Sequence, residues 1–194
     1  MILKFDRDGL LSEVSNLLSA GRLALCAACA ERLMTCYETD NLQRKSSVFR
    51  TALDQAWDHL LDVRPPPESV QALYDQALEA IPDDEDDSFL PYAQEAAIAV
   101  TYLLDVWNND AAMSVVYCLE QAYNSVDNFV VNSTLTGHTI TAQDEPSILS
   151  NPIVQAELAR QRNDIKACMS SQNIEWTAIV AGLRKEALIV NLFK

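Results

Sequence analysis

The sequence predicts an all-α protein, a single-domain bundle of about eight helices over residues 1–194, from three observations. Apolar residues recur three, four and seven positions apart along most of the chain, which is the spacing of one helix face. Only four glycines occur, whereas β-hairpins need turn glycines often. Apolar residues make up 49% of the chain, so a core can form without a disulfide or a structural metal.

The first part of the chain is expected to hold a short helix followed by longer ones. Gly9 and Gly21 flank the short helix, and the second helix starts near Arg22. The prolines at 65–67 end the third helix and open the fourth. The third helix carries an apolar stripe made of Phe49, Ala52, Leu53, Ala56, Trp57 and Leu60.

Two more stripes predict the fifth and sixth helices, and Gly137 follows the sixth. These stripes are Ala93, Ala96, Ala97, Val100, Leu103, Leu104 and Trp107, then Ala112, Val116, Leu119, Tyr123, Val126 and Val130. Residues 132–141 are rich in β-branched and turn residues, so they are expected to form the main loop.

The last part of the chain begins with a helix-start signal, an asparagine cap at Asn151 followed by Pro152. This helix runs through Val154, Leu158, Ile165 and Cys168. A final helix carries Ile179, Val180, Leu183 and Ala187. Its Gly182 suggests a close helix crossing. No linker and no internal repeat divides the chain, which favours one domain.

The charge limits the partners. Lysine and arginine total 14 against 28 acids, a formal charge of -14. A field of this sign repels nucleic acid and anionic membrane surfaces, so neither is expected as a partner. Solubility is the main interpretation of the charge, and mimicry of nucleic acid or attraction of a basic protein partner is the alternative. Lys4, Asp6 and Arg7 interrupt the start, so no signal peptide is expected there. Charged residues also break every candidate membrane span. The expected location is the cytoplasm.

Several segments in a fixed order resemble a known family. They are Cys26 to Tyr37, Leu53 to Trp57, Ile81 to Asp86 with the alanine-rich helix after it, Asn151 to Glu157, and Leu183 with Arg184. Together they resemble the YjaG-like family of bacterial cytoplasmic proteins, a domain of unknown function. The resemblance implies an all-helical fold of this size and supplies no functional residues. The apolar end at 188–193 departs from the family's small-polar finish.

Three cysteines cluster in the second helix. Cys26 and Cys29 have the spacing of a thiol redox motif. Together with Cys36 they also fall on one face of a helix that starts several residues earlier, which favours core packing. A regulatory thiol and a metal site are the alternatives, although a zinc site would want a fourth ligand.

The sequence contains few residues and motifs that could support catalysis. The residues three positions before His59 and His138 are Ala56 and Leu135, so the Glu-x-x-His pairs of diiron bundles are absent. Nucleophile-elbow, phosphate-loop and His-Glu-x-x-His motifs are absent too. No cofactor and no metal is expected. His59 is interpreted as a boundary residue and His138 as a solvated loop residue.

The densest charge cluster is a candidate interaction surface, made of Asp83, Asp84, Glu85, Asp86 and Asp87. The run is contiguous and lacks glycine, unlike a calcium-binding loop. Acids before a helix favour its positive end, so capping and solvation is the main interpretation. A weak cation site or a basic partner is the alternative.

Glu31 and Arg184 are the other interaction candidates, and ion pairing within the protein is the simple interpretation of both. The nearest base to Glu31 follows at i+1 rather than i+4, so its partner must come from another helix, for which Arg184 is a candidate.

The favoured function is a non-enzymatic binding or regulatory protein that uses a helical groove or an acidic surface. One alternative is a metal-dependent hydrolase, which requires Glu31, Glu95 and Glu157 to converge in one cleft. Another is a thiol redox sensor, which requires an exposed Cys26 or Cys29.

Overall fold

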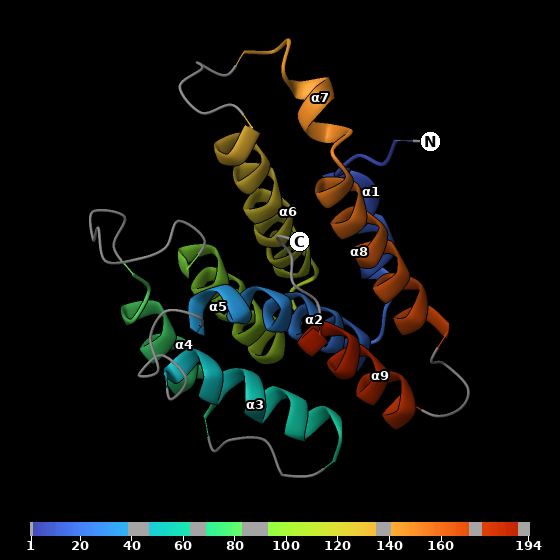
Figure 1. The fold of residues 1–194 in the computed structure, drawn as a ribbon. Helices are drawn as coiled ribbons and strands as arrows, with labels where there is room; N and C mark the ends of the chain where they lie inside the picture. Colours follow the sequence, from blue (N-terminus) through green and yellow to red (C-terminus); the bar gives the residue numbers. More distant parts are fainter. Residues whose placement is uncertain are drawn as a thin grey trace.

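The computed structural model describes residues 2–38, 47–62, 69–82, 93–134, 141–170 and 176–189, and this part of the chain is all-α, with no strand (Figure 1). Its helices are α1 (Arg7–Ser15), α2 (Ser19–Glu38), α3 (Val48–Leu60), α4 (Val70–Glu79), α5 (Ala93–Asn109), α6 (Ala112–Thr134), α7 (Glu145–Leu149), α8 (Pro152–Ser170) and α9 (Trp176–Ile189). The short α7 is the helix that the sequence analysis did not anticipate. None of the described helices is both long and apolar enough to cross a membrane.

Helix α2 is the centre of the fold. It contacts α3, α5, α6, α8 and α9, and Figure 1 shows it crossing the middle of the molecule between α3 on one side and α6 and α8 on the other. A helix covered on all sides must be apolar all round. The run from Leu23 to Ala30 meets this need, since all eight of its side chains are buried. Small alanine and cysteine side chains let the neighbouring backbones approach closely.

The predicted apolar stripes are confirmed as the core. Every stripe residue of α3 from Phe49 to Leu60 is buried. The α5 stripe is buried up to Leu104, while Trp107 at its end is only partly covered. The helix-start signal at Asn151 is also confirmed, because its side-chain Oδ1 accepts a hydrogen bond of 2.9 Å from the Ile153 N–H.

The expected role of the glycines was wrong. Gly9 lies inside α1, and Gly21 lies inside α2, which already begins at Ser19. At Gly9 a Cβ atom would collide with the carboxylate of Asp6, which caps α1 by accepting from the Gly9 N–H. At Gly182, no atom of the described residues beyond its own stretch of helix lies within 4 Å of the point that a Cβ would occupy, so the described helices make no close crossing there.

The main loop begins later than expected. Helix α6 continues through Thr134, past the expected loop start at Asn132. Val130 is buried near this end of α6, and such burial outweighs the weak helix preference of β-branched residues. Residues 135–140 lie outside the described part of the chain, as do the prolines at 65–67, His138 and the tail beyond Ile189.

Candidate functional site

Glu31 is a buried structural acid. Its side chain is 1% exposed. Its Oε1 accepts from Arg50 Nη1 at 2.8 Å and its Oε2 accepts from the Trp57 indole N–H at 2.8 Å. Both donors come from α3, so the acid fixes α3 against α2. A buried carboxylate with both oxygens satisfied is suited to packing rather than to chemistry.

The suggested pairing of Glu31 with Arg184 is wrong. The guanidinium of Arg184 lies 3.5 Å from Asp54 Oδ1 and 5.9 Å from the centre of the Trp57 ring. Arg184 therefore contacts the same tryptophan as Glu31 without reaching the acid. Arg50 is the base of Glu31 because α3 packs along α2 and places this guanidinium over the carboxylate.

A second buried ion cluster joins α2 to α8. Arg32, which is 3% exposed, lies 2.7 Å from Asp164 Oδ2 and 3.1 Å from Glu157 Oε1. Gln161 lies beside it and donates to Glu157 and to the carbonyl of Leu119. Burial raises the pKa of Asp164 although Arg32 opposes this shift.

The cleft that the hydrolase alternative requires is not formed by these contacts. Glu31 binds Arg50, Glu157 binds Arg32, and Glu95 lies 3.5 Å from Asn128. The acids therefore have separate partners. No group of three or more His, Cys, Asp or Glu side chains in the described ranges could hold a metal ion.

The cysteines lie in the core, as predicted for Cys26 and Cys29, while the Cys36 side chain lies outside the described part. Cys26 and Cys29 are fully buried. A hydrogen bond with Cys118, together with burial, raises the pKa of the Cys29 thiol well above its usual range. The redox alternative needed an exposed thiol here, and this burial overturns it. The acid run at 83–87 lies outside the described residues.

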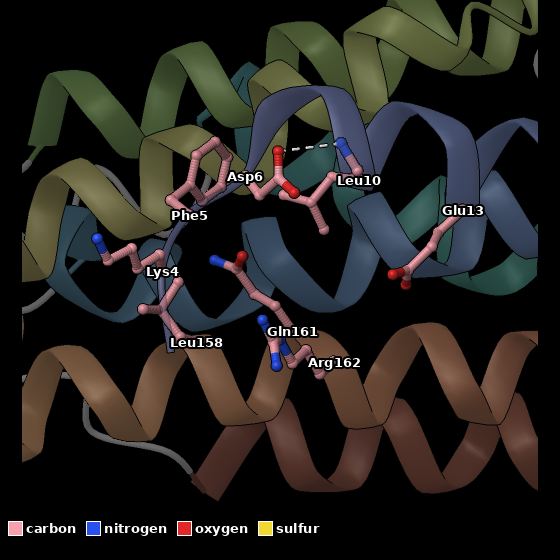
Figure 2. A pocket seen from close by; sticks show the side chains of 9 residues that line it. Lys4, Phe5, Asp6, Leu10, Glu13, Leu158, Gln161 and Arg162 are labelled. Atoms are coloured by element: carbon pink, nitrogen blue, oxygen red, sulfur yellow. Dashed lines mark hydrogen bonds between the residues drawn. The ribbon is translucent and has the colours of Figure 1, made fainter. Parts of the chain in front are cut away.

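Two cavities are less suited to a ligand. The first, between the N-terminal arm, α1 and α8, measures about 50 Å³ and has room for water only. Figure 2 shows its walls, with Phe5 of the arm on one side and Gln161 and Arg162 of α8 on the other. The second, about 360 Å³, lies between α6 and α7 beside Tyr123 and Asp127. Burial and Asp127 raise the pKa of Tyr123 to about 12.

The third cavity is the best candidate site. It measures about 500 Å³ and lies where α3 and α5 end and where α2 and α9 begin. Small-ligand sites usually measure roughly 300 to 1,000 Å³ and are largely apolar with a few placed polar groups. Buried Leu23, Leu60 and Val106 supply apolar walls. Ser19 and Ala20 also line it, and we call it the acidic aromatic cavity after its remaining lining residues, which are His59, Asp62, Trp107, Asp110 and Trp176.

Three rings line the acidic aromatic cavity. The rings of His59 and Trp107 stack with centroids 5.3 Å apart and planes 22° apart. Trp176, the first residue of α9, supplies the third ring. All three side chains are only partly buried, so part of each ring remains accessible from the cavity.

The acids of the cavity occupy unusual backbone positions. Asp62 follows the cap of α3 with φ 55°, and Asp110 follows α5 with φ 54°. Within the described ranges, they are the two non-glycine residues with positive φ. Glycine adopts this conformation without a side-chain clash and is the usual residue after a helix. The C-terminal end of a helix also carries partial negative charge. Aspartate tolerates this backbone conformation better than most other residues, so two carboxylates can stand at these helix ends.

The two acids differ in their partners. Asp110 Oδ1 accepts from Arg22 Nε at 2.8 Å, and its Oδ2 accepts from the Ser19 hydroxyl at 2.8 Å. The bond with Arg22 holds the pKa of Asp110 below its usual range. Asp62 is exposed and its carboxylate makes no ion pair within the described part of the chain. The cavity thus presents one neutralised acid and one open acid.

Sequence reasoning missed this site, although a signal exists. His59 stands three residues before Asp62, and Trp107 stands three residues before Asp110. The same spacing places a ring in the last turn of each helix and an acid just after it. Only the packing of α3 on α5 reveals that these two helix ends meet.

Comparisons with known proteins support a shared fold. A family model described as "Protein of unknown function (DUF416)" matches residues 9–191. The crystal structure of a DUF416 family protein from Shewanella baltica OS155 is similar, with a TM-score of 0.78 and 16% sequence identity, over 95% of this chain and 97% of that chain. No curated protein matches the chain.

Proposed function

We propose that this chain, which belongs to the DUF416 family, is a non-enzymatic binding or regulatory protein of the cytoplasm. A positively charged side chain from a basic segment of a partner protein enters the acidic aromatic cavity. The observation that carries the proposal is the placement of the open acid Asp62 beside the stacked rings of His59 and Trp107. We also propose that, within this family, the chain belongs with the YjaG-like proteins that its sequence resembles.

The chemistry of the lining supports a cationic ligand. Tryptophan faces attract cations through the negative face of the ring. The C-terminal ends of α3 and α5 add partial negative charge at the same place. Asp62 adds a full charge that no described base offsets. Each of these features disfavours an anionic ligand.

The charge of the whole chain supports a basic partner. A formal charge of -14 draws basic proteins towards the surface and speeds their encounter. The run of Asp83, Asp84, Glu85, Asp86 and Asp87 adds to this field and is proposed as a second contact for the same basic segment. Glu31 and Arg184 support the packing around Trp57 and do not line the cavity.

The partners of the buried acids support binding over hydrolysis. Glu31 and Glu157 are both held by arginines, and both contacts join α2 to a neighbouring helix. An acid that is locked in an ion pair is poorly placed to take a proton from a substrate.

Affinity capture from a cytoplasmic extract, followed by mass spectrometry, tests the proposal. The baits are the wild type, Trp107→Leu, Asp62→Asn, and Glu79→Gln as a control that removes one exposed charge elsewhere on the surface. We expect a lysine-rich protein to bind the wild type and Glu79→Gln, to bind both cavity variants weakly, and to be released by salt. Equal capture by all four baits would contradict the proposal.

A further inference from the structure

Few side chains on the described lining of the acidic aromatic cavity are free to accept a hydrogen bond. The hydroxyl of Ser19 donates to Asp110, and Arg22 occupies both carboxylate oxygens of Asp110. The remaining charged acceptor on the described lining is the carboxylate of Asp62. The other lining side chains are mostly hydrocarbon or aromatic ring.

The number of N–H donors separates the possible cations. A guanidinium carries five N–H donors and a primary ammonium carries three, whereas a quaternary ammonium carries none. Donors that enter a partly dry cavity without acceptors lose their hydrogen bonds to water. A quaternary ammonium therefore needs no acceptor from the cavity lining, whereas a guanidinium needs the most.

The charge of the cavity fits a single positive charge. Arg22 offsets Asp110, so Asp62 leaves one net negative charge on the described lining. The rings of Trp107 and Trp176 line the cavity, and aromatic rings commonly surround methylated ammonium groups. The space of about 500 Å³ admits such a group together with part of its carrier.

We infer that the acidic aromatic cavity binds an N-methylated ammonium group, with Trp107 and Trp176 against its methyl groups and Asp62 as the counter-charge. This inference rests on the proposed function and names the chemistry of its ligand. The group has two sources, the side chain of a trimethylated lysine in a partner protein and a small quaternary ammonium compound.

Calorimetry and tryptophan fluorescence test the inference with matched probes. Choline is compared with 3,3-dimethyl-1-butanol, which has the same shape and no charge. Lysine, trimethyllysine and arginine peptides of one basic sequence form the second arm. We expect choline to bind at least tenfold more tightly than the neutral alcohol. We expect the trimethyllysine peptide to bind most tightly of the three peptides and the arginine peptide least.

Two variants locate the binding. Trp107→Leu removes one ring and should weaken choline binding about tenfold or more, while Trp176 remains as a fluorescent reporter. Asp62→Gly removes the counter-charge and should weaken binding several-fold. Because Asp62 has a φ of 55°, glycine suits its backbone, and the melting temperature should not fall. Glu79→Gln should bind like the wild type.

The outcomes are separable. Equal affinity for choline and the neutral alcohol, tighter binding of the arginine peptide, or full binding by Asp62→Gly would each overturn the inference. Binding of choline without binding of the trimethyllysine peptide supports the inference and identifies a small compound as the source. Capture of a partner through the cavity without any ammonium binding would overturn the inference and leave the proposed function standing. Ammonium binding without a captured partner would support the inference and contradict the proposed function.

Discussion

Trp57 of α3 donates its indole N–H to the carboxylate of Glu31 of α2 over 2.8 Å, with both side chains buried. The other carboxylate oxygen accepts from Arg50, also of α3. The guanidinium of Arg184 in α9 lies 5.9 Å from the centre of the same ring. One tryptophan thus connects α2, α3 and α9, and its loss should weaken the packing of these three helices.

Replacing Trp57 separates its packing from its hydrogen bond. Trp57→Ala should lower the free energy of unfolding by about 3 to 5 kcal/mol because a large buried ring leaves a cavity. Trp57→Phe keeps most of the ring but removes the donor to Glu31, which should cost about 1 to 3 kcal/mol. Urea denaturation followed by circular dichroism measures both. In a Glu31→Gln background the phenylalanine variant should cost less, and an equal cost in both backgrounds would show that the bond is not coupled to stability.

Arg32 should be costly to remove alone. Arg32→Met leaves Asp164 buried without its base and leaves Glu157 with Arg160 alone, at 3.6 Å. Breaking a buried ion pair on one side typically costs about 3 to 5 kcal/mol. Neutralising both acids as well, with Glu157→Gln and Asp164→Asn, should return part of that stability. The midpoints of chemical denaturation of the three forms give the comparison. A triple variant no more stable than Arg32→Met would argue against the charge explanation.

Cys168 should make stability fall at alkaline pH. Burial raises the pKa of its thiol to about 12, against an ordinary value near 8.5 in the unfolded chain. Below about pH 8.5 both states keep the proton and nothing is lost. Between about pH 8.5 and 12 the unfolded chain releases the proton while the folded chain keeps it, so stability falls as pH rises, by about 1.4 kcal/mol per pH unit.

A Cys168→Ala variant isolates this effect, since the other buried thiols are common to both proteins. Urea denaturation at pH 8 and at pH 10 should show the wild type losing about 2 kcal/mol more than the variant between the two values. Parallel losses would mean that the thiol titrates normally in the folded protein.

The helices other than the short α7 were predictable because their apolar stripes and start signals are encoded locally. The stripe from Phe49 to Leu60 repeats at helical spacing, and every member is buried in the structure. The helix start at Asn151 needs only its own side chain and the next residues. Gly9 misled the prediction because its role depends on the position of the Asp6 carboxylate rather than on a helix end.

The contacts between helices were less predictable. The sequence around Glu31 does not determine which base pairs with it. The packing of α3 on α2 selects Arg50 rather than Arg184. The acidic aromatic cavity depends on two helix ends that are far apart in the chain. Its acids at Asp62 and Asp110 also need a left-handed backbone, which no local periodicity announces.

Replacing acids of the run at 83–87 distinguishes a capping and solvating role from a role in binding. If these residues only cap and solvate a helix start, replacing Asp84, Asp86 and Asp87 by Asn should cost about 0.3 to 1 kcal/mol for each lost contact with the helix end. Calorimetry with Ca²⁺ or Mg²⁺ should then detect no binding by either form, because the run lacks the spacing and the glycine of a calcium loop.

If the run contacts the basic segment, the triple variant should slow association of the lysine peptide at low salt, with dissociation little changed, because exposed charges act mainly on encounter. Trp107→Leu should instead speed dissociation, since the ring acts only once the cation is seated. Salt-sensitive divalent binding that disappears in the triple variant would make the run a cation site and contradict its capping role.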